Sequence, residues 1–144
     1  VKVERIAIVY WSGKGATKQM AEYVKHGIEA VGKTADVYVA GDFHKTMLNQ
    51  YDKIAFGCPA MGNEELEPSE FEPMFNEIEP YLKGKKVVLF GSYGWGEQTW
   101  MKDWEYQTYN DGALLMDHGL AIQDEPDEEG RINCENLGTT LAIS

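Results

Sequence analysis

The chain has 144 residues, which is enough for one domain with a sizeable hydrophobic core. Its 24 acidic and 13 basic residues give a net charge of −11, which argues against binding to nucleic acid or to an anionic membrane surface. The sequence contains no signal peptide and no apolar run of about 18 residues, so we expect a soluble, cytoplasmic protein.

An unbroken apolar run at residues 6–10, rich in β-branched side chains, predicts a strand that is buried on both faces. Trp11 and the turn SGKGAT at residues 12–17 follow directly and lead into a helical pattern over residues 16–31. Glycines let a backbone approach a ligand closely, and the N–H groups and dipole of a helix N-terminus favour negative charge. The turn therefore indicates an anion site, with a connecting turn that binds nothing as the alternative.

This turn differs from two well-known phosphate loops. It lacks the Gly-Lys-Ser/Thr ending of a Walker A loop, and Lys18 stands where a dinucleotide fingerprint has its third glycine. A loop of small and hydroxyl-bearing residues, as found here, suits the binding of one terminal phosphate.

The rest of the chain alternates between apolar runs and helical patterns. The apolar runs predict strands at residues 35–40, 53–58 and 87–90, and a broken fifth strand at residues 113–116 and 120–122. Apolar residues at helical spacing predict helices at residues 71–82 and 99–110, and a final helix with the inner face Cys134, Leu137 and Leu141. We expect the helix at residues 71–82 to begin with a capping box of Ser69 and Glu72.

The two cysteines, Cys58 and Cys134, lie far apart in the sequence and belong to no CxxC or Cys/His cluster. We therefore expect each to be a small buried hydrophobic residue rather than a metal ligand or half of a disulfide. No metal site is expected.

Alternating strands and helices with short connections predict a single α/β domain over residues 1–144. We expect a doubly wound, five-stranded parallel sheet in the flavodoxin-like order 2-1-3-4-5, with helices on both faces. Ligands of such sheets bind at the carboxyl ends of the strands, near the switch point between strands 1 and 3. Because the turn at 12–17 and the loops at 59–64, 92–98 and 123–125 lie at that edge, we expect them to form one site.

Four stretches of the sequence carry a family resemblance. They are YWSGKGAT from Tyr10, GCPAMGNEELE from Gly57, GKKVVLFGSYGWG from Gly84 and QDEPDE from Gln123. Together they resemble the short-chain flavodoxins of the clostridial type, which are FMN-containing electron carriers, and the resemblance covers nearly all of the chain. It implies a low-potential protein that shuttles single electrons through non-covalently bound FMN and that is a carrier, not an enzyme.

The resemblance also implies roles for individual residues. The FMN phosphate would be held through hydroxyl and backbone N–H groups by Ser12, Gly13, Gly15 and Thr17. Met61 would pack on one face of the isoalloxazine ring, Trp95 would stack on the other, and Glu64 would accept a hydrogen bond from the flavin N3–H. The other expected cofactor-binding residues are Trp11, Lys14, Ala16, Pro59, Ala60, Gly62, Asn63, Ser92, Tyr93, Gly94, Gly96, Gln123, Asp124 and Glu125.

Two positions depart from the family's phosphate loop, which usually reads S/T-G-T-G-N-T. Lys14 replaces a threonine, and Ala16 replaces an asparagine whose side chain could bond the phosphate or brace the loop. Lys14 could supply a compensating cation, or it could point into water and only offset the acidic surface. Of these two readings we predict compensation, so that FMN binding survives and weakens with added salt more than a neutral loop would allow.

Two features are expected to set the redox behaviour. The peptide between Gly62 and Asn63 can flip at low cost, because both residue types tolerate positive φ, and one orientation would present the Gly62 carbonyl to a protonated flavin N5. A plain tight turn is the alternative. Carboxylates on the loops at the cofactor edge would oppose negative charge on the flavin; these are Glu64, Glu65, Glu67, Asp124, Glu125, Asp127, Glu128 and Glu129.

As partners we expect redox proteins with basic docking patches, such as reductases and oxidoreductases, and we expect the protein to be a monomer. Two other functions fit the same fold. One is an NAD(P)H-dependent quinone reductase, which would need the space over the flavin that Trp95 would occupy. The other is the FMN domain of a larger flavoprotein. A signalling receiver does not fit, because its acidic residues after strands 1 and 3 are replaced by Trp11 and Pro59.

Overall fold

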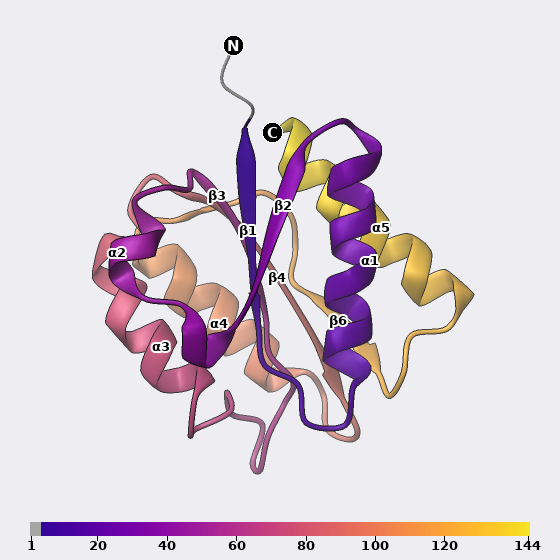
Figure 1. The fold of residues 1–144 in the computed structure, drawn as a ribbon. Helices are drawn as coiled ribbons and strands as arrows, with labels where there is room; N and C mark the ends of the chain where they lie inside the picture. Colours follow the sequence, from indigo (N-terminus) through magenta and orange to yellow (C-terminus); the bar gives the residue numbers. More distant parts are fainter. Residues whose placement is uncertain (1–3) are drawn as a thin grey trace.

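The computed structural model describes residues 4–144, which form a parallel sheet between two layers of helices (Figure 1). The strands are β1 (Arg5–Tyr10), β2 (Thr34–Val39), β3 (Lys53–Gly57), β4 (Lys86–Tyr93), β5 (Leu114–Leu115) and β6 (Leu120–Gln123). Their order is β2-β1-β3-β4-β5. The short β5 pairs with the start of β4, and β6 pairs with the later part of β4. The predicted doubly wound fold and its broken fifth strand are confirmed.

Helices cover both faces of this sheet. α1 (Ala16–Ala30) and α5 (Glu128–Ile143) lie on one face, and α2 (Lys45–Leu48), α3 (Phe71–Ile78) and α4 (Thr99–Asn110) lie on the other (Figure 1). Two short 3₁₀ helices, η1 (Ala40–Asp42) and η2 (Glu79–Tyr81), complete the structure. Within residues 4–144, no helix combines the length and the apolar character that crossing a membrane requires.

Each face of the sheet has its own hydrophobic core. Along β1, Val9 packs on the side of α3 and α4 with Phe71 and Trp104, whereas Ile8 packs on the side of α1 and α5 with Met20. The rings of Phe71 and Trp104 meet edge to face with centroids 5.4 Å apart, a favourable aromatic geometry. Burial on both faces explains why the central strands are continuous apolar runs. The same packing holds the carboxyl ends of these strands in place.

The start of α3 differs from the predicted capping box, because neither Ser69 nor Glu72 caps the helix. Instead, the buried carboxylate of Glu67 accepts hydrogen bonds from the backbone N–H groups of Ser69, Glu70 and Phe71 at 2.8, 2.7 and 3.0 Å. A carboxylate at this place satisfies unpaired N–H groups and also complements the helix dipole. The capping-box prediction was wrong, and an acidic residue from the preceding loop does the capping.

β4 continues three residues past the predicted strand, through Gly91 and Ser92 to Tyr93. Gly91 belongs to the strand and pairs with Ala121 of β6, and the position requires glycine because a Cβ there would lie 2.0 Å from the carbonyl oxygen of Cys58. As a result, Ser92 and Tyr93 reach the functional edge from the end of a strand and not from a loop.

Candidate functional site

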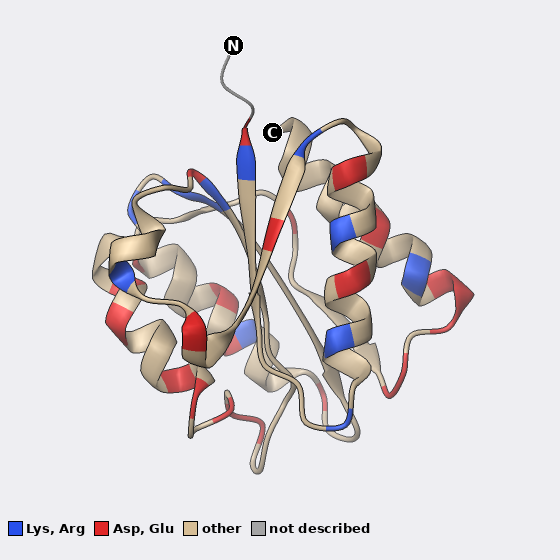
Figure 2. Ribbon diagram, viewed as in Figure 1, with Lys and Arg blue, Asp and Glu red and all other residues tan. Residues whose placement is uncertain are grey.

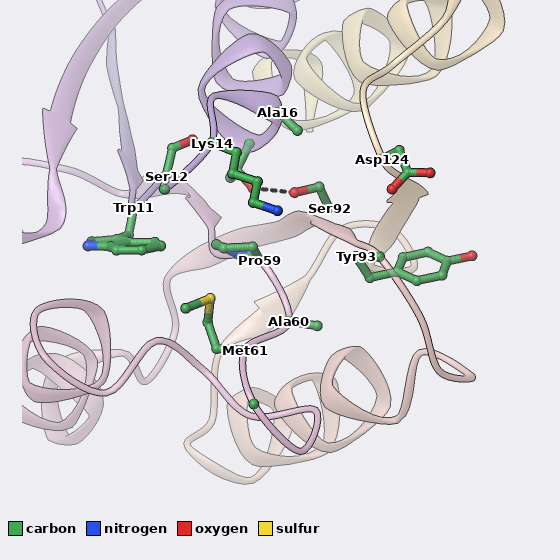
Figure 3. A pocket seen from close by; sticks show the side chains of 14 residues that line it. Trp11, Ser12, Lys14, Ala16, Pro59, Ala60, Met61, Ser92, Tyr93 and Asp124 are labelled. Carbon is green, nitrogen blue, oxygen red and sulfur yellow. Dashed lines mark hydrogen bonds between the residues drawn. The ribbon is translucent and has the colours of Figure 1, made fainter.

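A cavity of about 420 Å³ opens at the carboxyl ends of β1, β3 and β4, where the segments that follow these strands meet (Figure 3). Its volume lies in the range of pockets that hold small ligands and cofactors. The lining residues are Trp11, Ser12, Gly13, Lys14, Ala16, Thr17, Pro59, Ala60, Met61, Gly62, Ser92, Tyr93, Gly94 and Asp124. All of them belong to the predicted set, whereas Gly15, Asn63, Glu64, Trp95, Gly96, Gln123 and Glu125 lie outside this wall.

The turn between β1 and α1 presents backbone donors to one end of the cavity. Gly15 has a φ of +105°, a left-handed conformation that favours glycine, and its N–H donates to the Ser12 hydroxyl oxygen at 3.1 Å. The N–H of Gln19 donates to the Gly15 carbonyl at 2.9 Å, so the N–H groups of residues 16–18 precede the first bond inside α1. With the helix dipole behind them, these N–H groups can bind an anion.

Two buried hydroxyl groups lie at the same end. Thr17 Oγ1 and Ser92 Oγ are 2.8 Å apart, and the two residues are 1% and 7% exposed. Because one hydroxyl donates to the other, one O–H of the pair remains to donate to a ligand. Figure 3 shows the side chain of Lys14 reaching into this part of the cavity.

The turn at residues 61–65 forms the opposite wall, and the side chain of Met61 points from it into the cavity (Figure 3). The N–H of Met61 donates to the Glu65 carbonyl at 2.8 Å, and the N–H of Glu65 donates to the Met61 carbonyl at 2.9 Å. Gly62 has a φ of +53° and Glu64 a φ of +58°, whereas Asn63 between them does not have a positive φ. No atom lies within 4 Å of a Cβ built on Gly62, so backbone conformation, not crowding, favours glycine here.

Glu64 connects this turn to the start of α4. Its Oε1 accepts a hydrogen bond from the N–H of Thr99 at 2.9 Å. A Cβ on Gly96 would lie 2.7 Å from the Glu64 carboxyl carbon, so the carboxylate rests against the 94–98 loop. One carboxylate therefore holds together the two loops that carry Met61 and Trp95. Trp95 itself is 64% exposed.

Two members of the acidic cluster predicted at this edge, Glu67 and Asp127, cap helices. Glu67 is only 3% exposed, so it does not belong to an open acidic surface as we predicted. Burial tends to raise its pKa, but hydrogen bonds from Ser69 and from the start of α3 hold that pKa below its ordinary value. Asp127 caps α5 through the N–H of Gly130 at 2.8 Å. Figure 2 shows the remaining acidic positions on the loops that follow β3 and β6 and in the first turn of α5.

Hydrogen bonds between distant segments support the cavity wall, and the sequence did not reveal them. The N–H of Ala60 donates to the Ser92 carbonyl at 2.9 Å, and the N–H of Asp124 donates to the Tyr93 carbonyl at 2.8 Å. These bonds join the loop after β3 and the end of β6 to the end of β4. Both bonds link residues more than thirty positions apart along the sequence, so no local sequence pattern predicts them.

Both cysteines are free and buried, as predicted. Burial raises the pKa of the Cys58 and Cys134 thiols, so both stay protonated and act as core side chains. Within residues 4–144, no group of three or more His, Cys, Asp or Glu side chains is placed to hold a metal ion.

Known proteins share this fold and much of this sequence. The family model "Flavodoxin" matches residues 8–138. The chain is 44% identical over 135 residues to a flavodoxin of Clostridium beijerinckii, covering 94% of this chain and 97% of that protein. It is 44% identical over 138 residues to a flavodoxin of Megasphaera elsdenii, covering 95% and 98%. The solution structure of two-electron reduced Megasphaera elsdenii flavodoxin matches with a TM-score of 0.88 at 42% identity, covering 96% of this chain and 99% of that chain.

Proposed function

Because the chain belongs to the flavodoxin family of FMN-binding electron carriers, we propose that its FMN lies in the cavity at the carboxyl ends of β1, β3 and β4. The observation that carries this placement is a helix N-terminus with free N–H groups facing the turn at 61–65 across one cavity. The donor-rich end suits a terminal phosphate, and the wall around Met61 suits a flat ring. In this proposal residues 1–144 form one flavodoxin-like domain.

The phosphate would be bound by the N–H groups of residues 16–18, by the hydroxyl of Ser12 and by the one O–H that the Thr17–Ser92 pair leaves free. A phosphate has three strong acceptor oxygens, so it can use several of these donors together. Each hydrogen bond to a charged group contributes about 1.5–3 kcal/mol. Riboflavin, which lacks the phosphate, should therefore bind much more weakly than FMN.

The ring would lie between Met61 and Trp95. Covering the exposed indole of Trp95 with a flat ring would remove apolar surface from water, which favours this arrangement. Glu64 would accept the flavin N3–H with one oxygen while its other oxygen stays bound to Thr99. The bound flavin supplies the electron-accepting chemistry, and the chain holds the ring, shields its faces and sets the surrounding charge.

The acidic loops would make the loaded protein a low-potential carrier. Glu65, Asp124 and Glu125 lie on the segments that flank the cavity. A carboxylate about 8 Å from the ring opposes an added negative charge by about 0.5–2 kcal/mol, depending on the local dielectric. Several such carboxylates would together lower the potential at which the last electron is accepted.

The same negative surface suggests how partners dock. A chain with a net charge of −11 is attracted to basic patches, so we propose reductases and oxidoreductases with such patches as partners of a monomeric, cytoplasmic carrier. This docking would weaken as salt is added, because exposed charges are screened.

The proposal can be tested by stepwise reduction of the FMN-loaded protein. We expect the second one-electron potential to lie well below that of free FMN and to rise when Asp124 is changed to Asn. Asp124 has a φ of +57°, which asparagine also tolerates, so this variant removes the charge without changing the backbone. Glu29→Gln removes the same charge at the far end of α1 and should have little effect. A second potential equal to that of free FMN would contradict the proposal.

A further inference from the structure

Lys14 is the only basic side chain among the described residues that line the cavity. It stands in the turn just before the N-terminus of α1, and Figure 3 shows it directed into the cavity on the side of Ser92. Within residues 4–144, Lys14 forms no ion pair with an acidic side chain. The acidic lining residue, Asp124, comes from a different loop. The donor-rich end of the cavity therefore has an exposed lysine with which no carboxylate of residues 4–144 forms an ion pair.

The neutral donors at this end carry no full positive charge. Thr17 and Ser92 use one of their two hydroxyl hydrogens on each other, and the N–H of Gly15 is used by Ser12. Ala16 has no side-chain donor. A phosphate monoester carries a charge of about −1.5 to −2 near neutral pH, and the remaining hydroxyl and N–H donors bring no full positive charge to it. An ammonium group at Lys14 would supply that charge.

The rest of the chain makes this cation more important. The net charge of −11 repels an approaching phosphate at long range, and that repulsion is strongest at low salt. A positive charge beside the bound phosphate offsets this repulsion, because electrostatic attraction grows as the distance between the charges falls.

We propose that Lys14 is the phosphate-recognising cation of this site, pairing with the FMN phosphate and selecting a phosphorylated flavin over riboflavin. This inference rests on the proposed placement of FMN in the cavity. It concerns a residue at which the chain differs from the usual phosphate loop of its family. The cation also favours the doubly ionised form of the phosphate.

The test compares flavin dissociation constants of the parent, Lys14→Met and Lys14→Arg. At low salt we expect Lys14→Met to weaken FMN binding by about tenfold to a hundredfold, the equivalent of one lost charge-assisted hydrogen bond. Riboflavin binding should stay the same, and Lys14→Arg should keep most of the FMN affinity. Lys102→Met, at an exposed position on α4 outside the cavity wall, removes an equal charge and should change FMN binding by less than about twofold.

The salt dependence of FMN affinity separates the attraction of the phosphate to Lys14 from its repulsion by the net negative charge of the chain. In Lys14→Met the only full charges that act on the phosphate are those of the net-negative chain, so added salt should strengthen FMN binding. In the parent, salt also screens the attraction to Lys14, so the affinities of the two proteins should converge at high salt. A second readout is the ³¹P NMR titration of bound FMN, whose phosphate should take up its proton at lower pH in the parent than in Lys14→Met.

Equal FMN affinities and equal phosphate titrations for the parent and Lys14→Met would overturn the inference. So would an equal loss of FMN and riboflavin binding, since that would mean a change of shape and not of charge. If the parent binds riboflavin but gains nothing from the phosphate, the recognition of phosphate fails while the placement of the ring stands. If the parent binds neither flavin, the proposed function fails together with the inference.

Discussion

Replacing Thr17 by valine tests the phosphate end of the cavity with a change of almost no volume. Thr17 Oγ1 lies 2.8 Å from Ser92 Oγ, and both residues are buried. Losing this bond and leaving Ser92 without its partner should lower the free energy of unfolding of the flavin-free protein by about 1–3 kcal/mol. Losing a hydroxyl that also serves the phosphate should weaken FMN binding by about 1.5–3 kcal/mol, which is about 10-fold to 150-fold.

Thr108 provides a matched control in α4. It is also fully buried, and its Oγ1 donates to the Trp104 carbonyl at 2.7 Å, away from the cavity. Thr108→Val should cost about 1 kcal/mol of stability and leave the FMN dissociation constant unchanged. Urea unfolding measures the first quantity, and quenching of flavin fluorescence measures the second. Thr17→Val with the FMN affinity of the parent would show that the hydroxyl does not serve the phosphate. Equal weakening by both variants would show that the effect is general destabilisation.

Two further variants test other parts of the structure. Burial, followed by the neighbouring carboxylate of Asp111, raises the pKa of Glu79 from its ordinary value of 4.5 to about 7. The folded state therefore binds more protons between these values, and about 1–2 kcal/mol of stability, after allowance for screening by water, is lost as the pH rises from about 4.5 to 7. Urea unfolding at pH 5 and pH 8 should show that Glu79→Gln removes this loss, and an unchanged pH dependence would contradict the assignment. Gly62→Val places a β-branched residue at a φ of +53°. If the flip on reduction carries position 62 into a conformation that only glycine adopts readily, about 1–3 kcal/mol of extra strain in the flipped form should lower the first one-electron potential by about 40–130 mV, and an unchanged potential would exclude the flip.

The strands and the wall of the cavity were predictable because their signals are local. β1, β3 and β4 are buried on both faces, so each is a continuous apolar run in the sequence. Small and hydroxyl-bearing residues follow these runs, and the winding rule for parallel sheets places them at one edge. The strand pattern therefore predicted which loops meet at this edge, whereas individual lining residues such as Met61 and Asp124 were implied by the family resemblance, and their roles toward FMN stay predictions.

The errors arose where a contact between distant residues decides the local structure. The sequence pattern at Ser69 and Glu72 matches a capping box, but the fold brings Glu67 to the same N–H groups. Gly91 follows the pattern of a loop, yet it lies within β4, where it pairs with β6 and where a side chain would collide with the Cys58 carbonyl. No spacing rule could show these contacts, since each depends on the assembled sheet.

The central claim is that one FMN occupies the cavity at the carboxyl ends of β1, β3 and β4, and flavin titration of the flavin-free protein tests it most directly. The account predicts saturable quenching of flavin fluorescence at one FMN per chain, with riboflavin and FAD bound more weakly. Saturable binding should be lost or strongly reduced when Gly15, which needs its left-handed backbone, is changed to valine. No saturable FMN binding by the parent, or FAD bound as tightly as FMN, would contradict the account.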